Sequence, residues 1–170
     1  KVLGHNTDVS GFELAIRRKD YDIKDKKVFI LGAGGVVSSI ILALKKMGVA
    51  KIFLSNRTKK KAELLKNFFS DLQIVDWGEV PQFDMIINAT SLGLNKDDEI
   101  KLNYKEIGQN KLFYDVIYNP KQTKFLSKAQ QFGNQTENGK MMFIYQAHQA
   151  FCLWHKVIPK IDDETIKLLD

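Results

Sequence analysis

The sequence has few cysteines, few prolines and no long apolar run. Its 170 residues include one cysteine, Cys152, and three prolines. One cysteine excludes an internal disulfide framework and a cysteine-based metal cluster. No apolar run approaches the roughly 20 residues that a membrane-spanning helix needs, and residues 1–8 have no apolar signal-peptide core. We therefore expect a protein of the reducing cytoplasm with no membrane partner.

Acidic residues are outnumbered by basic ones. The chain has 26 Lys and Arg against 20 Asp and Glu, a net charge of +6. A lysine-rich solvated surface accounts for this balance, and attraction of a polyanionic small molecule is the alternative. The basic residues are not interleaved with aromatic residues along one stripe, so we do not expect nucleic acid as a partner.

The sequence offers no recognisable metal site. Histidine, cysteine and carboxylate residues do not occur at metal-ligand spacing, and no serine–histidine–aspartate order indicates acyl transfer. We expect no bound metal, and no catalytic role for His5, His148 or His155.

Short apolar runs alternate with helical patterns along the chain. Strands are expected at residues 28–31, 52–54, 73–75, 85–87 and 112–117, and helices at 8–19, 36–47, 58–69, 123–132, 141–155 and 162–169. Alternation of this kind predicts right-handed crossovers and a parallel sheet. Apolar runs without polar alternation are typical of strands covered on both faces. The sequence thus predicts a doubly wound α/β fold of the Rossmann type, with a mainly parallel sheet and helices on both faces.

Capping residues can be predicted at the start of two of these helices. Thr7 or Asp8 is expected to cap the first helix. Thr58 is expected to cap a later helix, whose apolar face would comprise Ala62, Leu65, Phe68 and Phe69.

A glycine-rich turn, Gly32-Ala33-Gly34-Gly35, lies between a predicted strand and a predicted helix. This is the context of the dinucleotide-binding fingerprint, in which the first glycine permits a sharp turn and the second admits a pyrophosphate. The helix that follows would present free N–H groups and a partial positive charge to that phosphate. At the third fingerprint position Val37 replaces Gly or Ala, which should displace the helix slightly from the strand. A tight strand–helix connection without a ligand is the alternative.

The second predicted strand lacks an acidic residue at its end. NAD-binding sheets place a carboxylate there to accept from the ribose 2′-hydroxyl. Here the strand ends with Ser55-Asn56-Arg57-Thr58 and is followed by Lys59, Lys60 and Lys61. A guanidinium can bind a 2′-phosphate through two hydrogen bonds. The sequence therefore favours NADP over NAD, although some of these lysines are expected simply to be solvated.

With these pieces in place, the chain resembles the shikimate dehydrogenase family, the shikimate/quinate dehydrogenases, over nearly its whole length. Matching segments occur in the family's order at Gly4–Asp8 with Gly11-Phe12, Gly32–Gly35, Asn56–Thr58, Asn88–Ser91 with Gly93, Asp115–Pro120 with Thr123, and Gly139 through Gln146-Ala147 to Phe151–Trp154.

The resemblance implies NADP-dependent reduction of 3-dehydroshikimate to shikimate, on the route to chorismate and the aromatic amino acids. Enzymes of this family have an N-terminal substrate domain and a Rossmann domain. Residues 1–170 resemble the second domain with linking N-terminal and C-terminal helices, and the chain does not begin with Met. We therefore expect an upstream substrate domain, which would carry the family's catalytic lysine.

The resemblance also implies residue roles. Asp8 matches the active-site aspartate, which would orient and polarise the lysine partner, and the alternative is a helix cap. Tyr118 and Gln146, with Asp8, match substrate-binding positions. The expected cofactor-binding residues are Gly32, Ala33, Gly34, Gly35, Val36, Asn56, Arg57, Thr58, Lys61, Thr90, Ser91, Val116 and Gly139.

Other functions compete with this one. A dehydrogenase of broader specificity would also accept quinate, and another Rossmann enzyme, such as a glutamyl-tRNA reductase, would lack the Gly4–Asp8 motif and the Gln146 helix. A binding module would hold NADP without catalysis, which is our expectation for residues 1–170 in isolation. An interaction protein that uses the fold without a ligand would not need the glycine turn.

Overall fold

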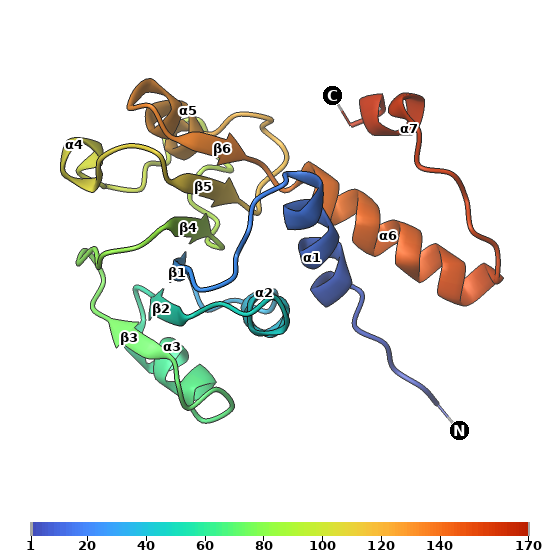
Figure 1. The fold of residues 1–170 in the computed structure, drawn as a ribbon, viewed down its shortest axis with the longest axis horizontal. Coiled ribbons are helices and arrows are strands. Elements are labelled where there is room, and N and C mark those ends of the chain that lie inside the picture. The colour runs from blue at the N-terminus through green and yellow to red at the C-terminus, as the bar shows by residue number, and fades with distance from the viewer. Residues whose placement is uncertain (1, 170) are drawn as a thin grey trace.

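One six-stranded sheet organises the chain. The computed structural model describes residues 2–169, and the predicted domain limits at Lys1 and Asp170 lie outside the described residues. All strand pairs are parallel, in the order β3-β2-β1-β4-β5-β6 (Figure 1). This is the doubly wound Rossmann order, so the predicted fold class is confirmed. The strands are β1 Lys27–Leu31, β2 Lys51–Ser55, β3 Gln73–Val75, β4 Met85–Asn88, β5 Leu112–Asp115 and β6 Gln135–Glu137.

Helices connect the strands and cover both faces of the sheet. They are α1 Asp8–Arg18, α2 Val37–Lys46, α3 Lys59–Lys66, α4 Tyr104–Ile107, α5 Lys124–Gln131, α6 Lys140–His155 and α7 Asp163–Lys167. None of the helices within residues 2–169 combines the length and the apolar character needed to cross a membrane.

The central strand β1 is apolar at successive positions because both of its faces are buried. Val28 and Ile30 pack into a core shared with α1, α2 and α6, while Phe29 and Leu31 pack into a second core shared with α4 and α5. All four side chains are buried. Successive strand residues point to opposite faces, so a sheet covered on both faces requires an uninterrupted apolar run.

The helices α1 and α6 form an antiparallel pair beside the sheet, visible at the right of Figure 1. Near the start of α1, Ser10 donates to Gln149 of α6. Just beyond its other end, Lys19 donates to the Thr136 carbonyl and forms an ion pair with Glu137, both in β6. Residues from both ends of the chain are therefore brought together on one face of the sheet.

Two short elements were not predicted. The strand β6 consists of polar residues at the edge of the sheet, and α4 is a single turn that Asn103 caps by accepting from the Glu106 N–H. Neither has the apolar periodicity on which sequence-based prediction depends.

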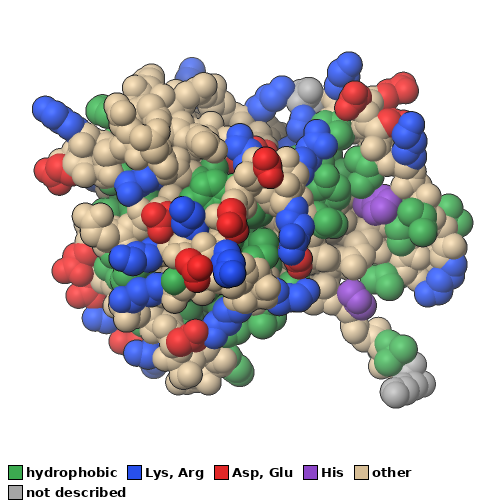
Figure 2. Space-filling view, viewed as in Figure 1, with side chains coloured by type: hydrophobic (Ala, Val, Ile, Leu, Met, Phe, Trp, Pro, Cys, Tyr) green, Lys and Arg blue, Asp and Glu red, His purple; other side chains and the backbone are tan. Residues whose placement is uncertain are grey.

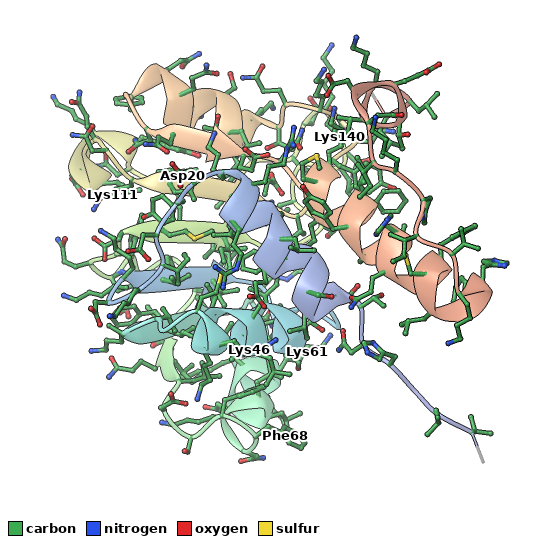
Figure 3. The ribbon with its side chains drawn as sticks, turned by 45° about the vertical axis from the view of Figure 1, so that its right-hand side comes forward. Asp20, Lys46, Lys61, Phe68, Lys111 and Lys140 are labelled. Carbon is green, nitrogen blue, oxygen red and sulfur yellow. The ribbon has the colours of Figure 1, made fainter. Side chains whose placement is uncertain are left out.

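Two details of the predicted helices are wrong. Asn6 caps α1 by accepting from the N–H groups of Asp8 and Val9 at 3.0 and 3.4 Å, whereas the Thr7 side chain makes no cap bond. The predicted apolar face of α3 fails at Phe68, because the helix ends at Lys66 and leaves the Phe68 ring 80% exposed. Figure 3 shows this ring at the outer end of the molecule.

Candidate functional site

The candidate site lies where the winding of the sheet reverses. Crossovers from β1 run through β2 to β3 on one side, and β4 to β6 lie on the other side. The connection after β1 and the connection after β4 therefore diverge and leave a crevice at the carboxyl edge, the usual ligand position in open α/β sheets. Figure 3 shows Lys61, at the start of α3, and Lys111, directly before β5, on opposite sides of the molecule.

The glycine turn after β1 borders this crevice, and the structural reasons for a glycine differ between its positions 32 and 34. Gly32 has φ +109°, and a Cβ there would lie 2.5 Å from the Ala89 carbonyl oxygen. Its N–H also donates to the Ser55 carbonyl at 2.8 Å. Gly34 has no positive φ, and a Cβ there would meet nothing within 4 Å. The backbone therefore demands glycine at position 32, while the glycine at position 34 faces open space.

Asn56 joins the glycine turn to the end of β2. Its side-chain oxygen accepts from the Ala33 N–H at 3.1 Å, and its amide donates to the Thr58 carbonyl at 2.8 Å. These two bonds fix the connection that carries Arg57 beside the glycine turn. The Asn56 side chain thus has a structural task in addition to the cofactor contact expected of it.

A cavity of about 250 Å³ opens at this junction, between the carboxyl ends of β1, β2 and β4. Its walls include eight of the thirteen expected cofactor-binding residues: Gly32, Ala33, Gly34, Asn56, Arg57, Lys61, Thr90 and Ser91. Trp77, Ala89 and Leu92 complete the lining.

The charge of the cavity lining is positive. Arg57 and Lys61 line it, and no lining residue carries a carboxylate. The neighbouring lysine behaves differently: Lys59 Nζ lies 2.6 Å from Asp76 Oδ1, and this partner raises the pKa of the Lys59 ammonium. Of the two lysines, Lys61 is the one that faces the cavity.

The wall formed by the connection after β4 is held by a buried polar network. Asn88 accepts from the N–H and hydroxyl of Thr90 at 3.0 and 2.7 Å, and its amide donates to Asp115 at 3.0 Å. Asp115 also accepts from the Ile117 N–H and the Thr123 hydroxyl. Burial raises the pKa of the Asp115 carboxyl, although these hydrogen bonds act in the opposite direction. The network fixes Thr90 at the cavity wall.

The remaining five expected cofactor-binding residues lie outside the cavity lining: Gly35, Val36, Thr58, Val116 and Gly139. Gly139 has a packing reason, because a Cβ there would lie 2.0 Å from the Val116 carbonyl oxygen. Val37, the departure from the glycine fingerprint, is fully buried in the core that includes Ile41 and Leu44.

The three expected substrate residues also lie outside this cavity. Asp8 begins α1. Gln146 lies on α6, where its amide donates to the Phe143 carbonyl at 3.1 Å. Tyr118 stacks on Phe143 with ring centroids 4.8 Å apart. Tyr118 and Gln146 thus share Phe143 as a neighbour, while within residues 2–169 no hydrogen bond joins either side chain to Asp8.

A close helix contact connects Asp8 to this group. Gly11, one turn after Asp8, faces α6 so closely that a Cβ would lie 2.8 Å from Gln146 Cβ and 2.9 Å from the Met142 carbonyl oxygen. Residues 8 and 11 lie on one side of a helix. The carboxylate of Asp8 and the amide of Gln146 are therefore carried by two helices in direct contact.

Two of the three histidines take part in contacts within the fold, and His5 is exposed. His148 Nε2 lies 2.8 Å from the Pro159 carbonyl oxygen, and the His155 ring packs against Phe151. Throughout residues 2–169, the side chains of His, Cys, Asp and Glu form no group of three that could hold a metal ion.

Sequence reasoning gave no role to Trp77, Asn88 or Asp115 individually. The register of the sheet pairs Asn88 with Asp115. Both are polar residues that end apolar strands, and this signal could have identified them. Trp77 follows the short strand β3 and precedes Gly78, which by itself indicates only a turn.

Comparison with known proteins agrees with the geometry. Residues 13–125 match the family described as shikimate / quinate 5-dehydrogenase. A shikimate dehydrogenase (NADP(+)) of Pelagibacter ubique is 58% identical over 170 residues, covering 100% of this chain and 64% of that protein. This chain thus spans less than two thirds of its relative's length.

Two solved structures are similar over 98% of the chain. One is a shikimate dehydrogenase in complex with NADP+, with 32% identity, a TM-score of 0.86 and 61% of its own chain covered. The other is a quinate dehydrogenase from Corynebacterium glutamicum in complex with NAD, with 28% identity, a TM-score of 0.85 and 62% of its chain covered. The chain belongs to the shikimate/quinate 5-dehydrogenase family.

Proposed function

We propose that this chain binds NADP(H) in the crevice between β1, β2 and β4, and that the whole protein reduces 3-dehydroshikimate to shikimate. The observation that carries the proposal is the positive lining of the cavity. Arg57 follows the end of β2, where an NAD-binding sheet has a carboxylate, and Lys61 lies in the first turn of α3. The similarity to an NADP(+) enzyme of Pelagibacter ubique supports the same conclusion.

The residues present fit a dinucleotide. Gly34 is required neither by its φ nor by its neighbours, and it borders the cavity, so its lack of a side chain leaves room for a ligand at the backbone. The amino end of α2 follows directly and supplies a partial positive charge for a pyrophosphate. Arg57 and Lys61 would hold the 2′-phosphate, and Thr90 and Ser91 would line the path toward the nicotinamide.

The chemistry divides between the cofactor and the protein. NADPH, when bound, supplies the hydride. The reduced carbonyl oxygen also needs a proton and a group that holds it. In the proposal, Asp8 orients that proton donor, while Gln146 and Tyr118 bind hydroxyl groups of the substrate. Their helices and loops are fixed by the contact of Gly11 with Gln146 and the stacking of Tyr118 on Phe143.

Chain length favours a second function for residues 1–170 alone. They correspond to 64% of the Pelagibacter ubique relative. In isolation the chain would act as an NADP-binding module, since catalysis requires every reacting group to be held in position. Acceptance of quinate in addition to shikimate is the alternative for the whole protein.

Calorimetric titration tests cofactor binding. We expect NADP+ to bind more tightly than NAD+, and Arg57→Ala to weaken NADP+ binding by at least about tenfold, because charge-assisted hydrogen bonds contribute on the order of 1.5–3 kcal/mol. Lys60→Ala is the matched control, since Lys60 does not line the cavity. Equal affinities for the two nucleotides, or an unchanged Arg57→Ala variant, would overturn the cofactor assignment.

A kinetic assay tests the reaction. Protein expressed from the complete reading frame should oxidise shikimate with NADP+, and quinate is assayed in parallel. Asp8→Asn should lower kcat by about a hundredfold or more, the usual scale of proton-transfer catalysis, and leave NADP+ affinity unchanged. Absence of both activities in a folded protein that binds NADP+ would reject the reaction but not the nucleotide site.

A further inference from the structure

A second cavity of about 440 Å³ adjoins the candidate cofactor site. Three residues, Arg57, Trp77 and Leu92, line both cavities and form the boundary between them. The second cavity extends toward the face of the sheet that α4 and α5 cover, because Phe29 and Leu31 of that face form part of its floor. The two cavities adjoin at these three residues, and together they are called the groove.

The two halves of the groove differ in chemistry. The first half has the glycine turn, Lys61 and no carboxylate. The second half has an apolar floor, and its two carboxylates, Glu79 and Glu99, are balanced by Lys101 and the shared Arg57, so its lining has no net charge. Phosphate groups are therefore favoured in the first half, and a flat uncharged ring in the second. The apolar floor comprises Phe29, Leu31, Leu92, Ile100 and Leu102.

Trp77 is held at this boundary by a short tight turn. The Glu79 N–H donates to the Asp76 carbonyl at 3.1 Å, and Gly78 has φ +101°. The Asp76 carboxylate is paired with Lys59 of α3 at 2.6 Å. Trp77 is nevertheless 40% exposed, although hydrogen bonds and an ion pair hold the residues on either side of it. A large aromatic surface is therefore left open to a ligand.

We propose that Trp77 is a binding residue for the purine base of the cofactor, with the second half of the groove receiving the adenine. This inference rests on the proposed function. The base would lie against the indole and the apolar floor, while Arg57, at the boundary, holds the 2′-phosphate. An aromatic face suits the purpose, because a purine stacks on an indole without needing hydrogen bonds.

Fluorescence gives a direct test, since the chain has only two tryptophans. Trp154→Phe leaves Trp77 as the single emitter, and Trp154 is 78% exposed on α6 and lines neither cavity. Adenosine 2′,5′-bisphosphate is the probe, because it carries the base and the 2′-phosphate without the nicotinamide. Its binding should change the Trp77 emission, whereas nicotinamide mononucleotide at the same concentration should not.

A variant pair completes the test. Trp77→Ala should weaken binding of the bisphosphate by about tenfold, the scale of aromatic base stacking, and Trp77→Phe should retain most of the affinity. Circular dichroism and thermal unfolding establish that both variants fold.

The outcomes separate the two proposals. Calorimetric binding of NADP+ and the bisphosphate with unchanged Trp77 emission, together with full affinity in Trp77→Ala, would reject the role of Trp77 alone. Failure of the unsubstituted chain to bind either nucleotide would reject the cofactor site and the role of Trp77 together.

Discussion

At the scale of single residues, Gly32 and Gly34 stand in the same turn but meet different constraints. A side chain at position 32 would have to adopt φ +109° and approach the Ala89 carbonyl oxygen to 2.5 Å. A side chain at position 34 would meet open space on the wall of the candidate cofactor cavity. Substitution of Gly32 should therefore affect mainly stability, and substitution of Gly34 mainly cofactor binding.

Substitution of each glycine by alanine tests this separation. Gly32→Ala should lower the free energy of unfolding by about 2 kcal/mol or more, through backbone strain and overlap. Gly34→Ala should leave stability within about 0.5 kcal/mol and weaken NADP+ binding. Urea unfolding and calorimetry on both variants provide the measurements, and equal stability loss in the two would contradict this assignment.

The buried carboxyl of Asp115 gives a pH-dependent prediction. Burial raises its pKa in the folded chain above the ordinary value of 3.8. Its contribution to stability is therefore fully present below that ordinary value and is lost as the pH rises through the raised pKa. The free energy of unfolding lost in Asp115→Asn should accordingly be largest near pH 4 and become smaller toward neutral pH.

Asp71 is the control, because its pKa is shifted in the opposite direction to that of Asp115. The hydrogen bond from Lys45 lowers the pKa of this carboxyl, so its contribution is present above the ordinary pKa and is lost as the pH falls. The loss in Asp71→Asn should thus grow as the pH rises. Parallel pH trends in the two variants would contradict the burial argument for Asp115.

At the scale of elements, the contact between α1 and α6 connects the fold to the expected substrate residues. Gly11 allows the two helices to approach until Gln146 Cβ and the Met142 carbonyl fill the place of a side chain. Asn6 adds a second restraint, since it caps α1 and its amide donates to Ser39 of α2 at 3.0 Å. The position of Asp8 relative to Gln146 depends on these contacts.

Gly11→Ala tests this contact. In an exposed helix the change would stabilise by about 1 kcal/mol, but here the added methyl group should displace α6 and destabilise the chain by about 1–3 kcal/mol. Arg18→Ala, on the exposed face of the same helix, should change stability by less than about 0.5 kcal/mol. Denaturant unfolding of the unsubstituted chain and the two variants measures these changes. A stabilised Gly11→Ala variant would show that the helices are not in tight contact.

Most elements could be predicted because their signals are local and strong. The apolar runs of β1, β4 and β5 and the glycine turn identified the parallel sheet and its carboxyl edge. Polar β6 and one-turn α4 carry no such signal. Within the site, the sequence indicated Arg57 and Lys61, but the bridging role of Asn56 and the position of Trp77 depend on neighbouring strands and loops that no single segment reveals.

At the scale of the whole molecule, the end of α6 and the residues directly after it are apolar and exposed. Trp154 and Ile158 are 78% and 83% exposed, and Phe151 and Val157 lie beside them in sequence. Figure 2 shows hydrophobic side chains at this end of the molecule, while charged side chains of both signs are scattered over the part that carries the sheet. An exposed group of this kind promotes association.

We therefore expect residues 1–170 to self-associate with rising concentration. Trp154→Gln with Ile158→Gln should lower the average mass measured by sedimentation velocity, because burial of these side chains would no longer be favourable. Leu64→Gln, exposed on α3, is the matched control and should have no effect. A chain that stays monomeric at every concentration would contradict the expectation.

The central claim, an NADP site at the carboxyl edge of the sheet, is tested most directly by a crystal structure of the chain with NADP+. We predict the pyrophosphate at Gly34 and the amino end of α2, and the 2′-phosphate between Arg57 and Lys61. Ordered NADP+ bound elsewhere on the molecule, or a 2′-phosphate that contacts neither Arg57 nor Lys61, would contradict the account.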